Sequence, residues 1–137
     1  MSTLVDAGPL VAILDSGEAA HARCRDALPG LSLPLVTTWP AFTEAMYLLN
    51  RAGGWPAQRA LWALTESGRL LVEDLSAAAR ARSAQLMASY ADTPMDLADA
   101  TLVALAEESR QRKIFTLDSD FTVYRLDGRH PFDVVPG

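Results

Sequence analysis

The sequence predicts an α/β domain of three layers, in which helices cover both faces of a central, mainly parallel sheet. Short apolar segments of strand character alternate with segments of helical periodicity along the whole chain, and this alternation is typical of a parallel α/β sheet. A chain of 137 residues is long enough to bury one sizeable hydrophobic core. We therefore expect a single domain over residues 1–137, without an internal repeat or a linker.

In the first half of the chain, glycine and proline residues separate the predicted elements. Pro34 interrupts the second strand, a threonine at 37 or 38 caps the helix that follows, and Gly53-Gly54 separates two helices. In order, the expected elements are a strand at residues 3–6, a helix at 10–14, a helix at 18–28, a strand at 31–37, a helix from 40 to about 51 and a helix at 56–66.

In the second half, the clearest element is a helix over residues 93–107, opened by Pro94, whose missing N–H costs nothing in a first turn. Ser76 is the expected cap of the alanine-rich helix before it. In order, the expected elements are a strand at residues 70–73, a helix from 76 to 90, the helix at 93–107, a strand at 113–117 and a strand at 132–135.

Asp99 is the residue that first suggests a function. It lies within an apolar run between Leu97 and Leu102, where a carboxylate is costly to bury unless a cation meets it. Asp96 stands three residues earlier, so both carboxylates lie on one side of the helix start. The helix dipole also stabilises acids near a helix N-terminus, and this is an alternative, structural reason for the presence of either residue.

Three further acids occupy comparable positions. Asp6 follows the first strand, Glu44 lies early in the helix after the second strand, and Asp118 follows a late strand. Each has a structural explanation, as a helix cap, a solvated helix residue or an Asx turn. Together with Asp99 they predict one acidic crevice, because the carboxyl ends of parallel strands meet at one edge of the sheet.

Clustered carboxylates repel one another unless they take up protons or bind a cation. Oxygen ligands suit Mg²⁺ or Mn²⁺, whereas two scattered histidines and one cysteine do not favour zinc. Two bound divalent ions would offset four of the five net negative charges, which otherwise argue against general nucleic-acid affinity. The number of ions stays open.

The remaining composition limits the compartment and the class of protein. A single cysteine, Cys24, excludes an internal disulfide framework and indicates a reducing, cytoplasmic compartment. The apolar run from Leu4 to Leu14 is interrupted by Asp6 and has no basic segment before it, so we expect neither a signal peptide nor a membrane span.

Four motifs then identify a family resemblance: Leu4-Val-Asp-Ala-Gly-Pro-Leu10, Phe42-Thr-Glu-Ala45, Met95-Asp-Leu-Ala-Asp-Ala100 and Phe115-Thr-Leu-Asp-Ser-Asp-Phe121. In this order and spacing, the chain resembles the PIN domain, and within it the VapC-type toxins of bacterial toxin–antitoxin modules. The resemblance implies a PIN-like fold and a Mg²⁺- or Mn²⁺-dependent endoribonuclease. It also implies a cognate antitoxin, a homodimer and an RNA substrate. The chain offers no DNA-binding segment of its own.

The resemblance assigns catalysis and metal binding to Asp6, Glu44, Asp99 and Asp118, with Asp96, Asp120 and Thr116 as second-tier positions. We expect Asp6 and Asp99 to be direct ligands, Asp118 a direct or water-mediated one, and Glu44 the residue that orients the water activated by the metal. Attack by water would leave a 5′-phosphate and a 3′-hydroxyl.

Other classes of protein fit less well. A haloacid-dehalogenase-like phosphatase needs a second acid where Gly8 stands, and a receiver domain needs a lysine after a late strand, whereas Lys113 stands at the beginning of its strand. The main alternative is a catalytically idle α/β module that acts through protein partners. Metal titration distinguishes the two, because such a module would show no stabilisation by Mg²⁺ or Mn²⁺.

Aromatic and basic residues leave two more alternatives. Trp39, Trp55 and Trp62 fall around the helices at 40–66 and are expected to pack in the core; the alternative is an exposed surface for an antitoxin helix or for nucleotide stacking. An arginine of that antitoxin would then reach the acidic crevice. Six arginines are expected to be solvated unless they hold phosphates: Arg51, Arg59, Arg110, Arg112, Arg125 and Arg129.

Overall fold

The computed structural model describes residues 2–137, and strands alternate with helices through most of this range. The strands are β1 (Thr3–Val5), β2 (Leu35–Thr38), β3 (Leu70–Glu73), β4 (Lys113–Phe115), β5 (Arg125–Leu126), β6 (His130–Pro131) and β7 (Asp133–Val135). The helices are α1 (Ala7–Leu14), α2 (His21–Ala27), α3 (Trp39–Glu66), α4 (Ala77–Ser89) and α5 (Leu97–Ser109), with short 3₁₀ helices η1 (Leu28–Gly30) and η2 (Ser119–Thr122).

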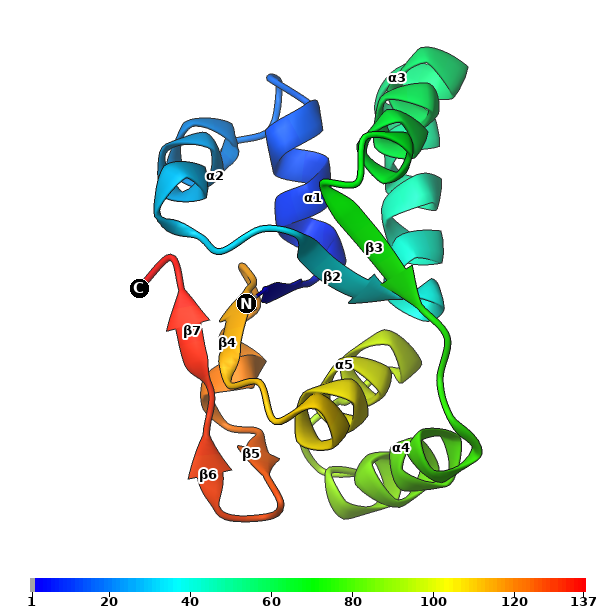
Figure 1. Ribbon diagram of the computed structural model, residues 1–137, viewed down its shortest axis with the longest axis vertical. Coiled ribbons are helices and arrows are strands. Elements are labelled where there is room, and N and C mark those ends of the chain that lie inside the picture. Colours follow the sequence, from blue (N-terminus) through cyan, green and yellow to red (C-terminus); the bar gives the residue numbers. More distant parts are fainter. Residues whose placement is uncertain (1) are drawn as a thin grey trace.

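Five strands form one sheet in the order β3-β2-β1-β4-β7, and every neighbouring pair is parallel. Helices α1, α2 and α3 lie on one side of this sheet, and α4 and α5 lie on the other (Figure 1). The expected α/β/α fold with a mainly parallel sheet is therefore confirmed. β1 lies at the centre, with β2 and β3 to one side of it and β4 and β7 to the other.

Two hydrophobic clusters hold the layers together, one on each face of the sheet. Leu4 and Ile114 pack in the cluster that includes α4 and α5, whereas Val5 and Phe115 pack in the cluster that includes α1 and α3. Successive residues of a strand point to opposite faces, so two neighbouring positions on each short central strand supply both cores. These strands are buried on both sides, which explains their continuous apolar sequence.

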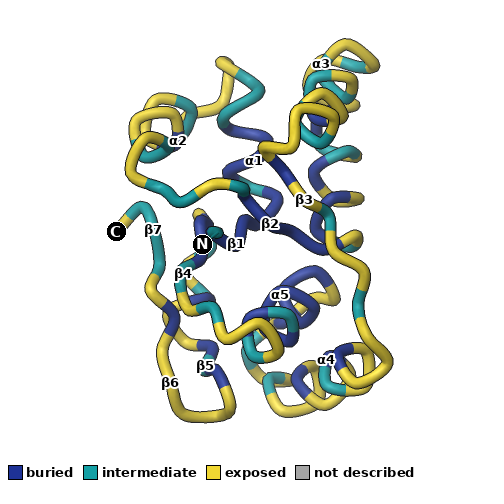
Figure 2. The backbone as a smooth tube through the Cα atoms, viewed as in Figure 1, coloured by how far each residue is buried: buried dark blue, intermediate teal, exposed yellow. Residues whose placement is uncertain are grey.

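Helix α5 contains the longest run of buried residues among the described helices. Every residue from Ala98 to Ala104 is buried, and Figure 2 shows its tube dark blue along most of its length. Its alanines allow close approach to α4 and to the sheet, and its first turn therefore brings Asp99 into the interior.

The helix expected over residues 93–107 begins later than predicted, at Leu97. Asp96 is its N-cap residue, and the Asp96 carboxylate accepts a hydrogen bond of 2.8 Å from the backbone N–H of Asp99. A capping carboxylate satisfies one of the free N–H groups of the first turn, and this contact, not Pro94, sets the start of the helix.

The predicted separation of two helices at Gly53-Gly54 appears as a break inside α3. Gly54 has φ 67° and ψ −153°, which is a non-helical conformation that favours glycine. Two expected caps behave differently: the Ser76 hydroxyl accepts a bond of 3.0 Å from the N–H of Ala79, whereas Thr38 at the start of α3 makes no side-chain cap bond. The Thr38 hydroxyl instead lies 2.8 Å from the hydroxyl of Thr101 on α5.

Several further boundaries differ from the prediction, and one pair of strands was missed. The largest difference is in β2, which begins at Leu35 and not at residue 31. α1 begins at Ala7, α2 begins at His21, β4 ends at Phe115 and β7 begins at Asp133. The missed element is an antiparallel hairpin of β5 and β6, with Asp127 at φ 52° and Gly128 at φ 69° in its turn. Asp-Gly is a common hairpin turn, and this dipeptide was the available signal. No helix within residues 2–137 combines the length and apolarity needed to cross a bilayer.

Candidate active site

Asp6 follows the central strand β1 and is the N-cap residue of α1. One of its carboxylate oxygens, Oδ1, accepts a bond of 2.8 Å from the N–H of Ala7, and the other, Oδ2, accepts one of 3.0 Å from the hydroxyl of Thr116. Only 7% of Asp6 is exposed. The residue therefore caps a helix and also faces the edge where β1 and β4 end.

Asp118 reaches the same edge from the segment after β4. The Thr116 hydroxyl, besides donating to Asp6, accepts a bond of 3.0 Å from the N–H of Asp118. Asp118 is the N-cap residue of η2, and its Oδ1 accepts a bond of 2.9 Å from the N–H of Asp120. The second-tier residue Thr116 thus links two acids of the predicted site, and the Asx-type turn occurs as well.

Asp99 enters from the opposite helical layer. It lies in the first turn of α5, is 6% exposed, and its Oδ2 accepts a bond of 3.1 Å from the buried hydroxyl of Tyr124. Carboxylate oxygens of Asp6, Asp99 and Asp118 lie within 4.8 Å of one another. Three segments that are distant in the sequence therefore deliver acids to one point.

These acids line a hollow of about 270 Å³ at the carboxyl edge of the sheet. The strand order diverges on either side of β1, and ligands bind at such a switch point in open α/β sheets. The residues that line the hollow are Asp6, Gly8, Glu44, Leu48, Asp96, Asp99, Leu117 and Asp118.

The other predicted residues take different positions around this hollow. Glu44 lines it from α3. As a whole this residue is exposed, although its carboxyl group is partly buried, and it lies outside the close group of three carboxylates. Asp96 also lines the hollow and is exposed. Asp120 is half-buried and does not line the hollow; its backbone N–H donates a hydrogen bond to Oδ1 of Asp118.

Burial and mutual repulsion shift the proton affinity of this cluster. Burial, with the charges of Asp96 and Asp6, raises the pKa of Asp99 to about 7. Burial also raises the pKa of Asp6, although the bonds from Ala7 and Thr116 oppose the rise. For Glu44, partial burial and the charge of Asp6 raise the pKa. These are the shifts expected of carboxylates that lack a neighbouring cation.

Both ion pairs found between residues 2 and 137 lie elsewhere, at Arg25–Asp26 and Arg82–Glu107. Three acids with converging oxygens and no paired cation in the described chain have the donor set of a hard divalent ion. The arrangement is therefore compatible with Mg²⁺ or Mn²⁺, which would lower the raised pKa of Asp6 and of Asp99.

Tyr124 is the residue of this region that sequence reasoning missed. It is fully buried, and burial together with the adjacent Asp99 raises the pKa of its hydroxyl. Its position after η2 carries no local signal, because an aromatic residue there is compatible with ordinary packing. Only the tertiary contact with α5 distinguishes it.

The expectation that the tryptophans pack in the core is wrong. Trp39 is 44% exposed, Trp55 60% and Trp62 38%. Trp39 and Trp62 lie against the buried ring of Phe42 and line a groove on α3, whereas Trp55 follows the break and lies outside the groove. We call this the aromatic groove; it is lined by Trp39, Phe42, Thr43, Met46, Tyr47, Asn50, Gln58 and Trp62.

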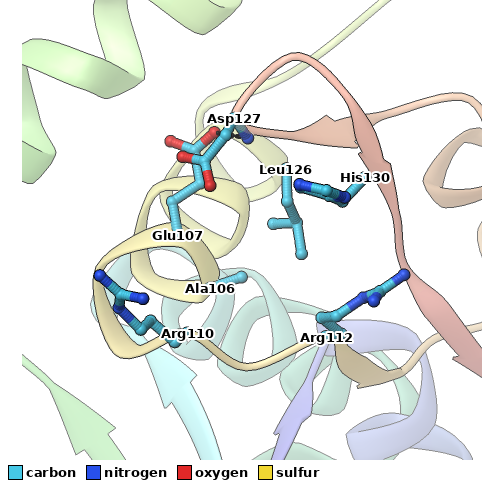
Figure 3. Close-up of a pocket in the computed structure, with 7 residues that line it drawn as sticks. All are labelled: Ala106, Glu107, Arg110, Arg112, Leu126, Asp127 and His130. Carbon is cyan, nitrogen blue, oxygen red and sulfur yellow. Dashed lines mark hydrogen bonds between the residues drawn. The ribbon is translucent and has the colours of Figure 1, made fainter.

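None of the six arginines lines the acidic hollow within residues 2–137. Arg125 donates to the backbone carbonyls of residues 122–124, and Arg112 donates to the carbonyl of Pro131. Arg110 and Arg112 border a separate hollow of about 390 Å³ near the far end of α5. There, Glu107 is already paired with Arg82. Figure 3 shows Glu107 and Asp127 together on one side of this hollow, with Arg110, Arg112 and His130 around the rest of it.

The fold and these carboxylates define an α/β protein with an acidic site at the carboxyl edge of its sheet. The sequence profile of the PIN domain matches residues 3–126. The chain belongs to the PIN-domain family.

Individual relatives agree with this assignment. The chain is 29% identical over 134 residues to ribonuclease VapC26 of Mycobacterium tuberculosis, covering 97% of this chain and 99% of that protein. The structure resembles M. tuberculosis VapC20, a sarcin–ricin loop cleaving toxin, with a TM-score of 0.82, 21% identity, and coverage of 88% of this chain and 93% of that one.

Two solved complexes contain similar chains. One is a toxin–antitoxin complex from Klebsiella pneumoniae, with a TM-score of 0.66, 22% identity, and coverage of 87% and 89%. The other is VapBC2 of Rickettsia felis bound to a fragment of promoter DNA, with a TM-score of 0.67, 12% identity, and coverage of 98% of each chain. At these identities, the likeness concerns the fold.

Proposed function

We propose that this chain is a Mg²⁺- or Mn²⁺-dependent endoribonuclease and the toxin of a toxin–antitoxin pair. The observation that supports it most is the approach of three aspartate carboxylates within 4.8 Å, at the switch point of the sheet. When bound, a divalent ion lowers the pKa of water and stabilises charge on a phosphate. Asp6, Asp99 and Asp118 are its proposed ligands.

Glu44 has a different proposed role, because it lines the hollow without joining the close group of carboxylates. A carboxylate whose pKa is raised is a better proton acceptor near neutral pH. In the proposed reaction, Glu44 orients the attacking water and accepts its proton. The bond between phosphorus and the 3′ oxygen then breaks, and the leaving 3′ oxygen takes up a proton from solvent, which gives a 5′-phosphate and a 3′-hydroxyl.

RNA is the proposed substrate because one relative is named a ribonuclease and another is described as cleaving the sarcin–ricin loop. The test is incubation of the purified protein with a mixed RNA pool and with single-stranded DNA, with and without Mg²⁺ or Mn²⁺. We expect metal-dependent cleavage of RNA only, and loss of cleavage in Asp99→Asn. Preferential cleavage of DNA would contradict the substrate. No cleavage and no metal-induced thermal stabilisation would favour the idle binding module.

An antitoxin helix in the aromatic groove is the proposed partner. Helix α3 carries both the groove and Glu44, so a partner seated in the groove lies beside the acidic hollow. An arginine from its tail would supply the positive charge that the acids lack. Two of the similar structures are toxin–antitoxin complexes, and we also propose a homodimer, to be measured by sedimentation.

Two exposed aromatic residues of α3 give a matched test of this partner. Tyr47 lines the groove and is 59% exposed, whereas Trp55 lies outside it and is 60% exposed. With the small protein encoded beside this chain, we expect Tyr47→Ala to weaken the complex about tenfold and Trp55→Ala to leave it unchanged. Equal effects would contradict the groove. A chain that is harmless on overexpression and binds no adjacent product would contradict the toxin assignment, but not the nuclease.

A further inference from the structure

The hydroxyl of Tyr124 lies between two parts of the chain that flank the start of α5. It is 3.1 Å from Oδ2 of Asp99, inside the helix, and 3.2 Å from the carbonyl oxygen of Pro94, before the helix. Its single proton is available to both acceptors. Tyr124 therefore ties the segment before α5 to the carboxylate in its first turn.

The ring of Tyr124 is held rigidly. Edge-on contacts join it to Tyr90 and to Phe121, each with ring centres 5.1 Å apart, and Phe121 contacts Phe132 in the same way. The backbone N–H of Tyr124 also donates to the carbonyl of Asp120. A hydroxyl on a ring with so many fixed contacts has little freedom, so it defines the position of the oxygen it binds.

The same segment carries Asp118. Residues 118–124 run from that acid through η2 to Tyr124, whose hydroxyl then bonds Asp99. The relative placement of Asp99 and Asp118 therefore depends on this bond. It also engages Oδ2 of Asp99, while Oδ1 has no hydrogen-bond partner within residues 2–137. Asp6 is held by the hydroxyl of Thr116 in a parallel way.

We propose that Tyr124 is a positioning residue of the metal site. By binding Oδ2 it holds the Asp99 carboxylate in place and leaves Oδ1 free, so that Oδ1 would be available to an ion. The inference rests on the proposed metal-dependent function. Residues that do not touch the metal commonly orient metal-binding carboxylates through hydrogen bonds. Losing one such bond lowers metal affinity about 10- to 100-fold. Tyr124 has no role in the reaction itself; it acts through Asp99.

Tyr124→Phe tests the proposal, and Tyr90→Phe is its matched control. Tyr90 contacts the Tyr124 ring, but its hydroxyl accepts a bond of 3.0 Å from the backbone N–H of Arg125 and touches no acid of the site. Both changes remove one hydroxyl and keep the ring. Thermal unfolding without metal identifies folded protein, and calorimetric titration with MnCl₂ then gives the affinity.

We expect Tyr124→Phe to bind Mn²⁺ about tenfold more weakly than the unmodified chain, and Tyr90→Phe to bind within about twofold of it. Cleavage by Tyr124→Phe should need correspondingly more Mn²⁺, while its KM for RNA at saturating Mn²⁺ is unchanged. An unchanged Mn²⁺ affinity in Tyr124→Phe, or an equal loss in both variants, would overturn the proposal.

A second measurement needs no substitution. The buried hydroxyl proton of Tyr124 should give a slowly exchanging NMR signal that shifts when MgCl₂ is added, and a signal that does not move would also overturn the proposal. If the unmodified chain itself binds neither Mn²⁺ nor Mg²⁺, the proposed metal site fails, and the role of Tyr124 fails with it. That outcome differs from one in which the unmodified chain binds metal and Tyr124→Phe binds it equally well, which would overturn only the role of Tyr124.

Discussion

The two ends of α5 each carry an acid, buried at Asp99 and half-buried at Glu107, and their surroundings are opposite. Asp99, in the first turn, faces Asp6 and Asp118 and has no ion-pair partner within the described chain. Glu107, in the last turn, binds Arg82 through two bonds of 2.8 Å and 3.1 Å and accepts another of 2.7 Å from the N–H of Asp127. One acid is left with like charges, and the other is fully paired.

The difference separates a structural acid from a functional one. Pairing at Glu107 joins α4, α5 and the β5–β6 hairpin, and it needs nothing from outside the chain. The raised pKa of Asp99 means that its ionised form is disfavoured until a cation arrives. The ionised Asp99 carboxylate lowers the stability of the fold, although the rest of the helix is well packed. Such a residue indicates a functional site at which a bound ligand supplies the positive charge.

Asp99→Asn should produce the largest effect. Because an amide cannot provide the negative charge that the metal needs, cleavage should fall by about two orders of magnitude or more. The measurement is the initial rate on RNA at saturating Mn²⁺. Glu107→Gln is the control from the other end of α5, and it should retain the rate under conditions where it is folded. Full activity of Asp99→Asn would invalidate the assignment of the site.

Glu44→Gln should have the next largest effect. Loss of the group that accepts the proton should lower kcat about 10- to 100-fold, while Mn²⁺ affinity changes less than in Asp99→Asn, because Glu44 lies outside the close group of carboxylates. Glu66→Gln, on an exposed position of the same helix, is the control. Loss of Mn²⁺ binding equal to that of Asp99→Asn would instead make Glu44 a principal ligand.

Glu107→Gln should reduce stability without affecting the metal. The Glu107 side chain is only 10% exposed, and losing its charge-assisted bonds should lower the free energy of unfolding by about 1.5 to 3 kcal/mol. Denaturant unfolding provides the value. Asp26→Asn removes the other ion pair, whose side chains are 60% and 71% exposed, and should change stability by less than about 0.5 kcal/mol. Comparable losses would contradict the contrast between these pairs.

The pH dependence of stability without metal should show whether Asp99, at the start of α5, is destabilised in its ionised form. The folded-state pKa of Asp99, about 7, lies above its usual value of 3.8, so its contribution to stability is present at low pH and is lost as pH rises towards 7. The stability advantage of Asp99→Asn over the unmodified chain should therefore grow by about 2 kcal/mol between pH 5 and pH 8. Thermal and denaturant unfolding at both pH values measure it, and a constant difference would show that Asp99 is not destabilised by burial.

The sequence alone determined the layers of this protein and the segments that carry its acids. Strand and helix periodicity, the cap at Ser76 and the glycine break at residue 54 are local features, and local interactions decide them. The placement of Asp6 and Asp118 at one sheet edge also followed from the sequence, because both follow strands and parallel strands have their carboxyl ends on the same side whatever their order. The sequence predicted Asp99 at the same site, but Asp99 lies on α5 and reaches the other two acids through the packing of that helix.

Only the tertiary structure determined the exact start of one helix, the exposure of several side chains and the contacts between separate layers. The start of α5 depends on the Asp96 cap, the exposure of the tryptophans depends on what does not cover α3, and Tyr124 meets Asp99 across 25 residues of sequence. Each of these depends on the approach of separate layers, and a residue's own neighbours in the chain do not record that approach. The type of each side chain determines which hydrogen bonds, charges and apolar contacts it can make, and the packing of the layers determines which residue becomes its partner.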